Sequence, residues 1–147
     1  MPAIIDTSVA LKWVLAESDS PQALALRRDF LARQDILYAP SLLIYEATNT
    51  LYAAARDGAL SWQTVDVGLE DILKTIRLRI PSSSIAKRTV AITHLTSQTY
   101  AYDAQFLALA EHLNGDLWTA DERFLRAMHR HGFSQVKALS AYPRSTM

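Results

Sequence analysis

Short apolar runs alternate with longer amphipathic segments along most of the chain. The runs AII, ILY and LW are too short for helices and are followed by polar or turn residues, which is typical of strands buried in a parallel sheet. The predicted strands are residues 3–5, 36–38, 76–81, 117–118 and 136–139. The predicted helices are residues 9–15, 21–34, 42–58, 61–75, 85–95, 103–113 and 122–129. This alternation predicts an α/β fold with a short, mainly parallel sheet.

Local signals mark the ends of several predicted helices. Pro21 suits the first position of a helix, Ser41 is the expected N-cap of the next one, and Gly58 ends it. Before the last helix, Thr119 and Glu122 have the spacing of a capping box, in which the two side chains satisfy the exposed amides. We therefore expect that this helix does not need Asp121 as a cap.

The composition is that of one ordinary globular domain. The chain has 147 residues, a formal net charge of zero and 50% hydrophobic residues, so we expect a single domain over residues 1–140 and a mobile tail over residues 141–147. The absence of cysteine excludes thiol catalysis, Cys-zinc sites and disulfides. The start lacks a signal-peptide pattern and no apolar run is long enough for a membrane span, so we expect a cytoplasmic protein without a membrane partner.

Acidic residues follow two of the predicted strands. Asp6 comes directly after residues 3–5, and Asp121 follows Leu117-Trp118. The carboxyl ends of parallel strands meet at one edge of a sheet, where sites are usually built. Glu46 lies in the first turns of a helix and Asp103 opens another. Each of these residues alone is more simply explained as a helix cap or a dipole partner, so the signal lies in their occurring together.

Four stretches of the chain resemble the PIN domain family, and within it the VapC-type toxin ribonucleases of type II toxin–antitoxin systems. They are IIDTSVALKW, IYEATNTL, YAYDAQFLALAE and LWTADERF, in the order and approximate spacing of the family. The segment HLTSQTYA, before Tyr102, is more polar than the usual approach to that helix. The resemblance implies a Rossmann-like, three-layer α/β/α fold.

The resemblance also implies roles for individual residues. It assigns catalytic and metal-binding roles to four acids: Asp6, Glu46, Asp103 and Asp121. It assigns supporting roles beside them to Thr7, Ser8, Asn49 and Thr119. The implied cofactor is Mg²⁺ or Mn²⁺, the implied substrate is RNA, and the implied partners are an antitoxin protein and a second copy of the chain. The chemistry agrees, because crowded carboxylates repel one another unless a hard cation lies among them.

Some basic residues are expected to contact the phosphates of RNA. Lys12 and Arg123 are the best candidates, because they lie next to the acidic motifs. The other basic residues more simply form a solvated face. The four histidines have no zinc-module spacing, so we expect no zinc site.

Other functions remain open from the sequence. The fold could serve RNA maturation without toxicity, or it could be a non-catalytic RNA or protein interaction module. A phosphatase of the haloacid dehalogenase type also begins with an aspartate after a strand. That class needs a second aspartate where this chain has Ser8, so the sequence disfavours it.

Overall fold

Five parallel strands form one sheet in the order β3-β2-β1-β4-β5. The structure is a computed structural model, and it describes residues 1–144. The strands are β1 (Ala3–Ile5), β2 (Leu37–Pro40), β3 (Ile76–Arg79), β4 (Asp116–Thr119) and β5 (Val136–Ala138). The chain builds outward from β1 to β3 and then returns to the other side of β1 for β4. The order therefore reverses between β1 and β4, where α/β folds place their sites.

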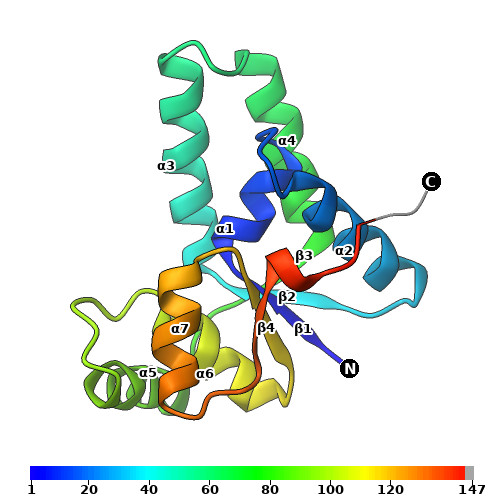
Figure 1. Cartoon of the computed structure of the whole chain (residues 1–147). Coiled ribbons are helices and arrows are strands. Elements are labelled where there is room, and N and C mark those ends of the chain that lie inside the picture. The colour runs from blue at the N-terminus through cyan, green and yellow to red at the C-terminus, as the bar shows by residue number, and fades with distance from the viewer. Residues whose placement is uncertain (145–147) are drawn as a thin grey trace.

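Helices surround this sheet, as the predicted α/β class requires (Figure 1). They are α1 (Thr7–Ala10), α2 (Ser20–Ala32), α3 (Leu42–Arg56), α4 (Trp62–Thr75), α5 (Ser83–Leu95), α6 (Ala104–Leu113) and α7 (Glu122–Arg130), with short 3₁₀ helices η1 (Leu11–Trp13) and η2 (Leu139–Ala141). In Figure 1, α3 and α4 extend as a pair away from the sheet, while α5, α6 and α7 lie together in the lower left of the view. The α/β fold predicted from the sequence is confirmed.

The middle of the sheet is the centre of the core. Ile4 and Ile5 of β1 are fully buried, which confirms that this strand is covered on both faces, and Leu117 of β4 is fully buried beside them. Helix α6 packs across β1, β2 and β4, and its Phe106 and Leu107 are also fully buried. This packing holds the ends of β1 and β4 side by side.

The first helical segment differs from the prediction for residues 9–15. Helix α1 begins at Thr7, because Asp6 caps it by accepting a hydrogen bond from the Ser8 amide at 3.4 Å. The chain then tightens into η1, which ends at Trp13. The carbonyl of Leu15 accepts a hydrogen bond from the Ser20 hydroxyl at 2.9 Å, which holds the following turn.

Two predicted helix caps have different outcomes. Gly58 follows the end of α3 with φ +84°, the left-handed conformation that glycine adopts without strain, so this prediction is confirmed. Ser41 does precede α3, but its own backbone is helical and its side chain makes no capping hydrogen bond. The expected Ser41 cap is therefore wrong, because an N-cap side chain needs an extended backbone to reach the helix amides.

The end of the described chain packs on the domain. Tyr142 donates a hydrogen bond to Asp29 at 2.8 Å, and its ring meets that of Trp118 edge-on. The expectation of a mobile tail over residues 141–147 lies partly outside the described residues, at positions 145–147. Within residues 1–144, no helix has the length and apolar character that a membrane span requires.

Gly115 provides a test of how tightly β1 and β4 are held. A Cβ atom there would lie 2.4 Å from the carbonyl oxygen of Pro2 and 2.9 Å from Ile4 Cδ1. Because the first obstacle is backbone, we expect Gly115→Ala to lower the free energy of unfolding by about 1–3 kcal/mol in a urea titration. Gly68→Ala is the comparison: its Cβ would lie 2.7 Å and 2.8 Å from the two methyl groups of Val14, so the obstacle is a half-buried side chain that can shift rather than backbone, and alanine favours the helix. A Gly115→Ala protein as stable as Gly68→Ala would contradict this packing.

Candidate functional site

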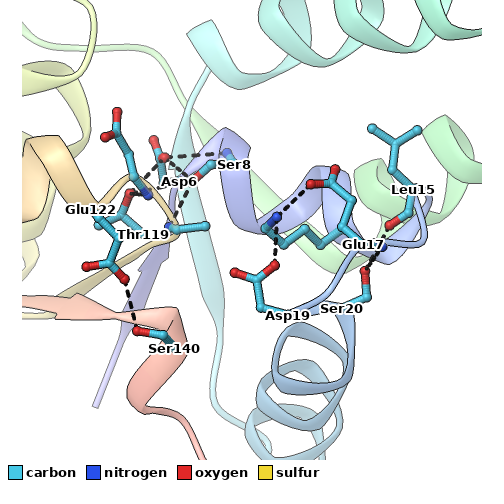
Figure 2. Close-up of polar contacts among 12 residues, drawn as sticks. Asp6, Ser8, Leu15, Glu17, Asp19, Ser20, Thr119, Glu122 and Ser140 are labelled. Atoms are coloured by element: carbon cyan, nitrogen blue, oxygen red, sulfur yellow. Dashed lines mark hydrogen bonds and ion pairs between the residues drawn. The ribbon is translucent and has the colours of Figure 1, made fainter.

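Asp6 lies at the point where β1 ends. Its amide donates to the Trp118 carbonyl at 3.0 Å, so the pairing of β1 with β4 continues up to this residue. Its side chain then leaves the sheet at the carboxyl edge. The Oδ2 atom accepts hydrogen bonds from the Ser8 hydroxyl and, at 3.1 Å, from the Thr119 hydroxyl (Figure 2).

The two hydroxyls also connect β1 to the end of β4. The Ser8 hydroxyl accepts a hydrogen bond from the Ala120 amide at 3.0 Å. The Thr119 hydroxyl accepts one from the Asp121 amide, also at 3.0 Å. Each hydroxyl therefore donates to Asp6 and accepts from the loop that carries Asp121. This network fixes the loop relative to the Asp6 carboxylate.

The start of α7 corrects one prediction. Asp121 is the N-cap, and its Oδ1 accepts a hydrogen bond from the Phe124 amide at 3.0 Å. Thr119 is still part of β4 and Glu122 is the first helical residue, so the expected capping box between them does not form. The Glu122 carboxylate instead accepts a hydrogen bond from the Ser140 hydroxyl at 3.0 Å (Figure 2).

Glu46 is joined to the same edge through α1. The Thr7 hydroxyl donates to Glu46 Oε1 at 2.7 Å, across 39 residues of sequence. Thr7 is buried and Glu46 is half-buried, so this contact lies at the junction of α1 and α3. Asn49 is exposed on α3, and its supporting role stays a prediction.

Asp103 directly precedes α6. Its backbone is already helical and its carboxylate makes no capping hydrogen bond. The Asp103 side chain therefore does not cap α6, although the sequence allowed this role. The helix leaves this carboxylate available for other contacts.

The pKa values indicate that the four acids lie near one another. Burial raises the pKa of Asp103 to about 6, and the charges of Asp6, Asp121 and Glu46 add to this increase. Burial also raises the pKa of Asp6; hydrogen bonds from Ser8 and Thr119 oppose this, and the charge of Asp121 adds to it. The pKa of Glu46 is raised by burial and by the charge of Asp6, against a hydrogen bond from Thr7. The four acids selected from the sequence thus lie close enough for their charges to interact.

The oxygen atoms of this cluster suit a hard cation. Within residues 1–144, none of the four carboxylates forms an ion pair. Among the described residues, Asp6, Glu46 and Asp121 each accept protein hydrogen bonds on one oxygen, which leaves the other oxygen for a ligand. Free carboxylate oxygens of this kind are the ligands that Mg²⁺ and Mn²⁺ prefer.

The cluster is not a closed cage. Within residues 1–144, no three Asp, Glu or His side chains converge tightly enough to surround a metal ion by themselves. An open arrangement fits Mg²⁺, which usually keeps several waters and binds few protein carboxylates directly.

Two histidines near the end of α7 contact backbone carbonyls. His129 Nε2 lies 2.6 Å from the Val136 carbonyl oxygen, and His131 Nδ1 lies 3.0 Å from the Ala127 carbonyl oxygen.

The two basic residues selected from the sequence have different surroundings. The Lys12 ammonium lies 3.0 Å from Glu17 Oε2 and 2.8 Å from Asp19 Oδ1, and its side chain is only 11% exposed (Figure 2). A phosphate would have to compete with these two carboxylates, and the contact stays a prediction. Arg123 is exposed on α7 and lines a cleft together with Asp103 and Asp121.

This cleft, of about 540 Å³, lies between the segment that joins α5 to α6 and one face of α7. Besides the three residues just named, its lining includes residues 96–100, Phe124, Ala127 and Arg130. Sequence reasoning missed Tyr100 and Arg130 as site residues. The signal for Arg130 was present, since positions 123, 127 and 130 share one face of a helix. Tyr100 lies in a loop without a periodic pattern.

Comparisons with known proteins agree on one family. The sequence pattern of the PIN domain family matches residues 3–129. PAE2754 from Pyrobaculum aerophilum superposes with a TM-score of 0.70 at 19% identity, over 95% of this chain and 85% of that one. VapBC2 from Rickettsia felis, in a complex with a promoter DNA fragment, gives a TM-score of 0.62 at 13% identity, over 94% and 97% of the two chains.

A third structure is VapC20 from Mycobacterium tuberculosis, described as a toxin that cleaves the sarcin–ricin loop. It gives a TM-score of 0.60 at 13% identity, over 92% of this chain and 98% of that one. At these identities the structural likeness shows the fold alone. A search of curated proteins found no match.

Proposed function

Because the chain belongs to the PIN domain family, we propose that it is a metal-dependent endoribonuclease that hydrolyses phosphodiester bonds of RNA. One observation carries the proposal: four carboxylates from distant parts of the sequence lie close enough for their charges to interact, beside the switch point of the sheet, and none forms an ion pair among the described residues. Such an arrangement is unfavourable for folding alone, because like charges repel. A binding site for a divalent cation explains it.

The proposed ligands are Asp6, Glu46, Asp103 and Asp121. A bound Mg²⁺ or Mn²⁺ would supply the positive charge that makes a water molecule nucleophilic and offsets the charge of the phosphate. Hydrogen bonds from neighbouring hydroxyls and amides orient three of these ligands. Ser8 and Thr119 hold one oxygen of Asp6, Thr7 holds one oxygen of Glu46, and the first turn of α7 holds one oxygen of Asp121.

The chain's own cations would bind the RNA backbone. Arg123 lies on the same cleft as Asp103 and Asp121, so its guanidinium can pair with a phosphate next to the one that is cut. Lys12 is a second proposed contact and would have to leave its pair with Glu17 and Asp19.

We propose further that this nuclease is the toxin of a toxin–antitoxin pair, acting in the cytoplasm as a homodimer. The similarity to VapBC2 and to the toxin VapC20 supports this assignment. A nuclease of RNA maturation with the same fold is the alternative. A small DNA-binding protein encoded immediately upstream would favour the toxin, and growth arrest on expression, relieved by that protein, would test it.

Removing the metal tests the nuclease activity itself. We expect purified protein to cleave RNA from tRNA and rRNA panels with Mg²⁺ or Mn²⁺, and EDTA to abolish the cleavage, because the acidic cluster then lacks its cation. Cleavage is followed on denaturing gels, and restoring excess Mg²⁺ is the control for damage by the chelator. Cleavage that continues in EDTA would require another mechanism. Binding of RNA without cleavage under any metal would favour the non-catalytic module.

A further inference from the structure

The cleft beside the acidic cluster is lined by an exposed tyrosine that the metal chemistry does not use. Tyr100 lines the cleft, yet 71% of its surface is exposed. Its ring centroid lies 6.1 Å from that of Tyr102, with the planes tilted by 31°. Neither side chain belongs to the core of the domain. An exposed tyrosine at the mouth of a polar cleft is suited to stacking against a planar ligand.

The opposite wall of the cleft carries two arginines. Arg123 and Arg130 both lie on α7, seven positions apart, and both line the cleft with Ala127 between them. Among the described residues neither has an ion pair, whereas Arg27, Arg56 and Arg88 are paired with carboxylates. Two guanidinium groups that are unpaired within residues 1–144 therefore line the same cleft as Asp103 and Asp121.

These features match the parts of a nucleotide. A base has a flat face that stacks on a tyrosine ring, and its flanking phosphates pair with arginines. The acidic cluster and this cleft share Asp103 and Asp121, so a chain bound in the cleft reaches the cluster directly. Only an unpaired nucleotide offers its base in this way, because a duplex keeps both faces of each base stacked.

Resting on the proposed nuclease function, we infer that this cleft is a subsite for an unpaired nucleotide next to the scissile phosphate. Tyr100 stacks on the base, and Arg130 and Arg123 hold the flanking phosphates. The loop of residues 96–103, which Figure 1 shows as the long segment joining α5 to α6, carries the stacking residue. Binding of a nucleotide would account for the polar sequence TSQTY of this loop, which fits neither a helix nor a strand pattern.

Measuring RNA binding on a protein that does not cleave separates the subsite from the catalytic step. Fluorescence anisotropy is measured with a labelled single-stranded oligoribonucleotide, with Mg²⁺, on protein carrying Asp6→Asn. In this background we expect Tyr100→Ala to weaken binding about 5- to 150-fold, as loss of one stacked base does. Tyr100→Phe keeps the ring and should bind as the parent does. Tyr52→Ala removes an exposed ring from α3, outside the cleft, and is the matched control.

The arginines have a different signature. Arg130→Ala should weaken binding and make the slope of log affinity against log salt shallower by about 0.7, the value for one phosphate of a single strand. Tyr100→Ala should leave that slope unchanged. Arg126→Ala is the control, because Arg126 has the same charge on the same helix but does not line the cleft.

The last test compares the binding of single-stranded RNA with that of duplex RNA. The same sequence annealed to its complement should bind at least about tenfold more weakly, because its bases are no longer free to stack on the protein. Equal affinity for the duplex, or a Tyr100→Ala protein that binds like its parent, would overturn the subsite. These binding measurements do not require cleavage. If the unmodified protein proved inactive as a nuclease but Tyr100→Ala still weakened RNA binding, the subsite would stand and the nuclease proposal would fail.

Discussion

Replacing Asp6 by asparagine should lower the rate of RNA cleavage by about 10²–10³-fold without unfolding the protein. The asparagine side chain keeps a carbonyl oxygen that can accept the hydrogen bonds of Ser8 and Thr119, so the connection between β1 and β4 survives. The variant loses the negative charge that a divalent cation needs. Because the Asp6 carboxylate is costly to ionise where it lies, its removal costs the fold little.

The measurement combines single-turnover cleavage with calorimetric titration of Mn²⁺ and a thermal melt. We expect lost cleavage, weaker Mn²⁺ binding and an unchanged or higher melting temperature. Asp66→Asn is the matched control, because Asp66 is exposed on α4 and contributes nothing to the cluster. Full activity of Asp6→Asn would show that Asp6 is not a ligand. Lost activity with unchanged Mn²⁺ affinity would limit Asp6 to positioning Ser8 and Thr119.

The sequence alone was enough to place the acids that follow strands. Asp6 and Asp121 come directly after short apolar runs, and the topology of parallel strands then brings the two ends to one edge. Glu46 and Asp103 carry no such local signal. Their helices reach the same edge only through tertiary packing, so the resemblance to a family was needed to select them.

Contacts between distant side chains were harder to predict. Thr119 has the spacing of a helix cap in the sequence. In the structure it belongs to β4 and donates a hydrogen bond to Asp6, which lies 113 residues away, so local spacing could not predict its role. Lys12 was selected for its closeness in sequence to Asp6, yet its two ion pairs arise from the turn after η1. The cleft that contains Tyr100 depends on how a loop lies against α7, and no periodic pattern encodes that.

Burial of the acidic cluster, together with the repulsion among its charges, should make the metal-free protein less stable as the pH rises. The ordinary pKa of Asp103 is 3.8, and it is raised to about 6 in the fold, so the folded state binds more protons than the unfolded state between these values. Stability is therefore lost as the pH rises from about 4 to about 6, and the loss is complete above that range. Asp6 and Glu46 act in the same direction, because their pKa values are raised too.

Asp103→Asn removes the contribution of Asp103 to this effect, since asparagine has no charge to bury. In EDTA at pH 7.5 we expect the variant to be more stable than the parent by about 1–3 kcal/mol in urea unfolding, and to match it at about pH 4. Adding Mg²⁺ should reverse the order at pH 7.5, because the cation stabilises the charged cluster of the parent but not that of the variant. The same stability difference at both pH values would mean that neither burial nor neighbouring charge raises the pKa of Asp103 in the fold. The arrangement on which the nuclease proposal rests would then be absent, whatever the activity of the purified protein.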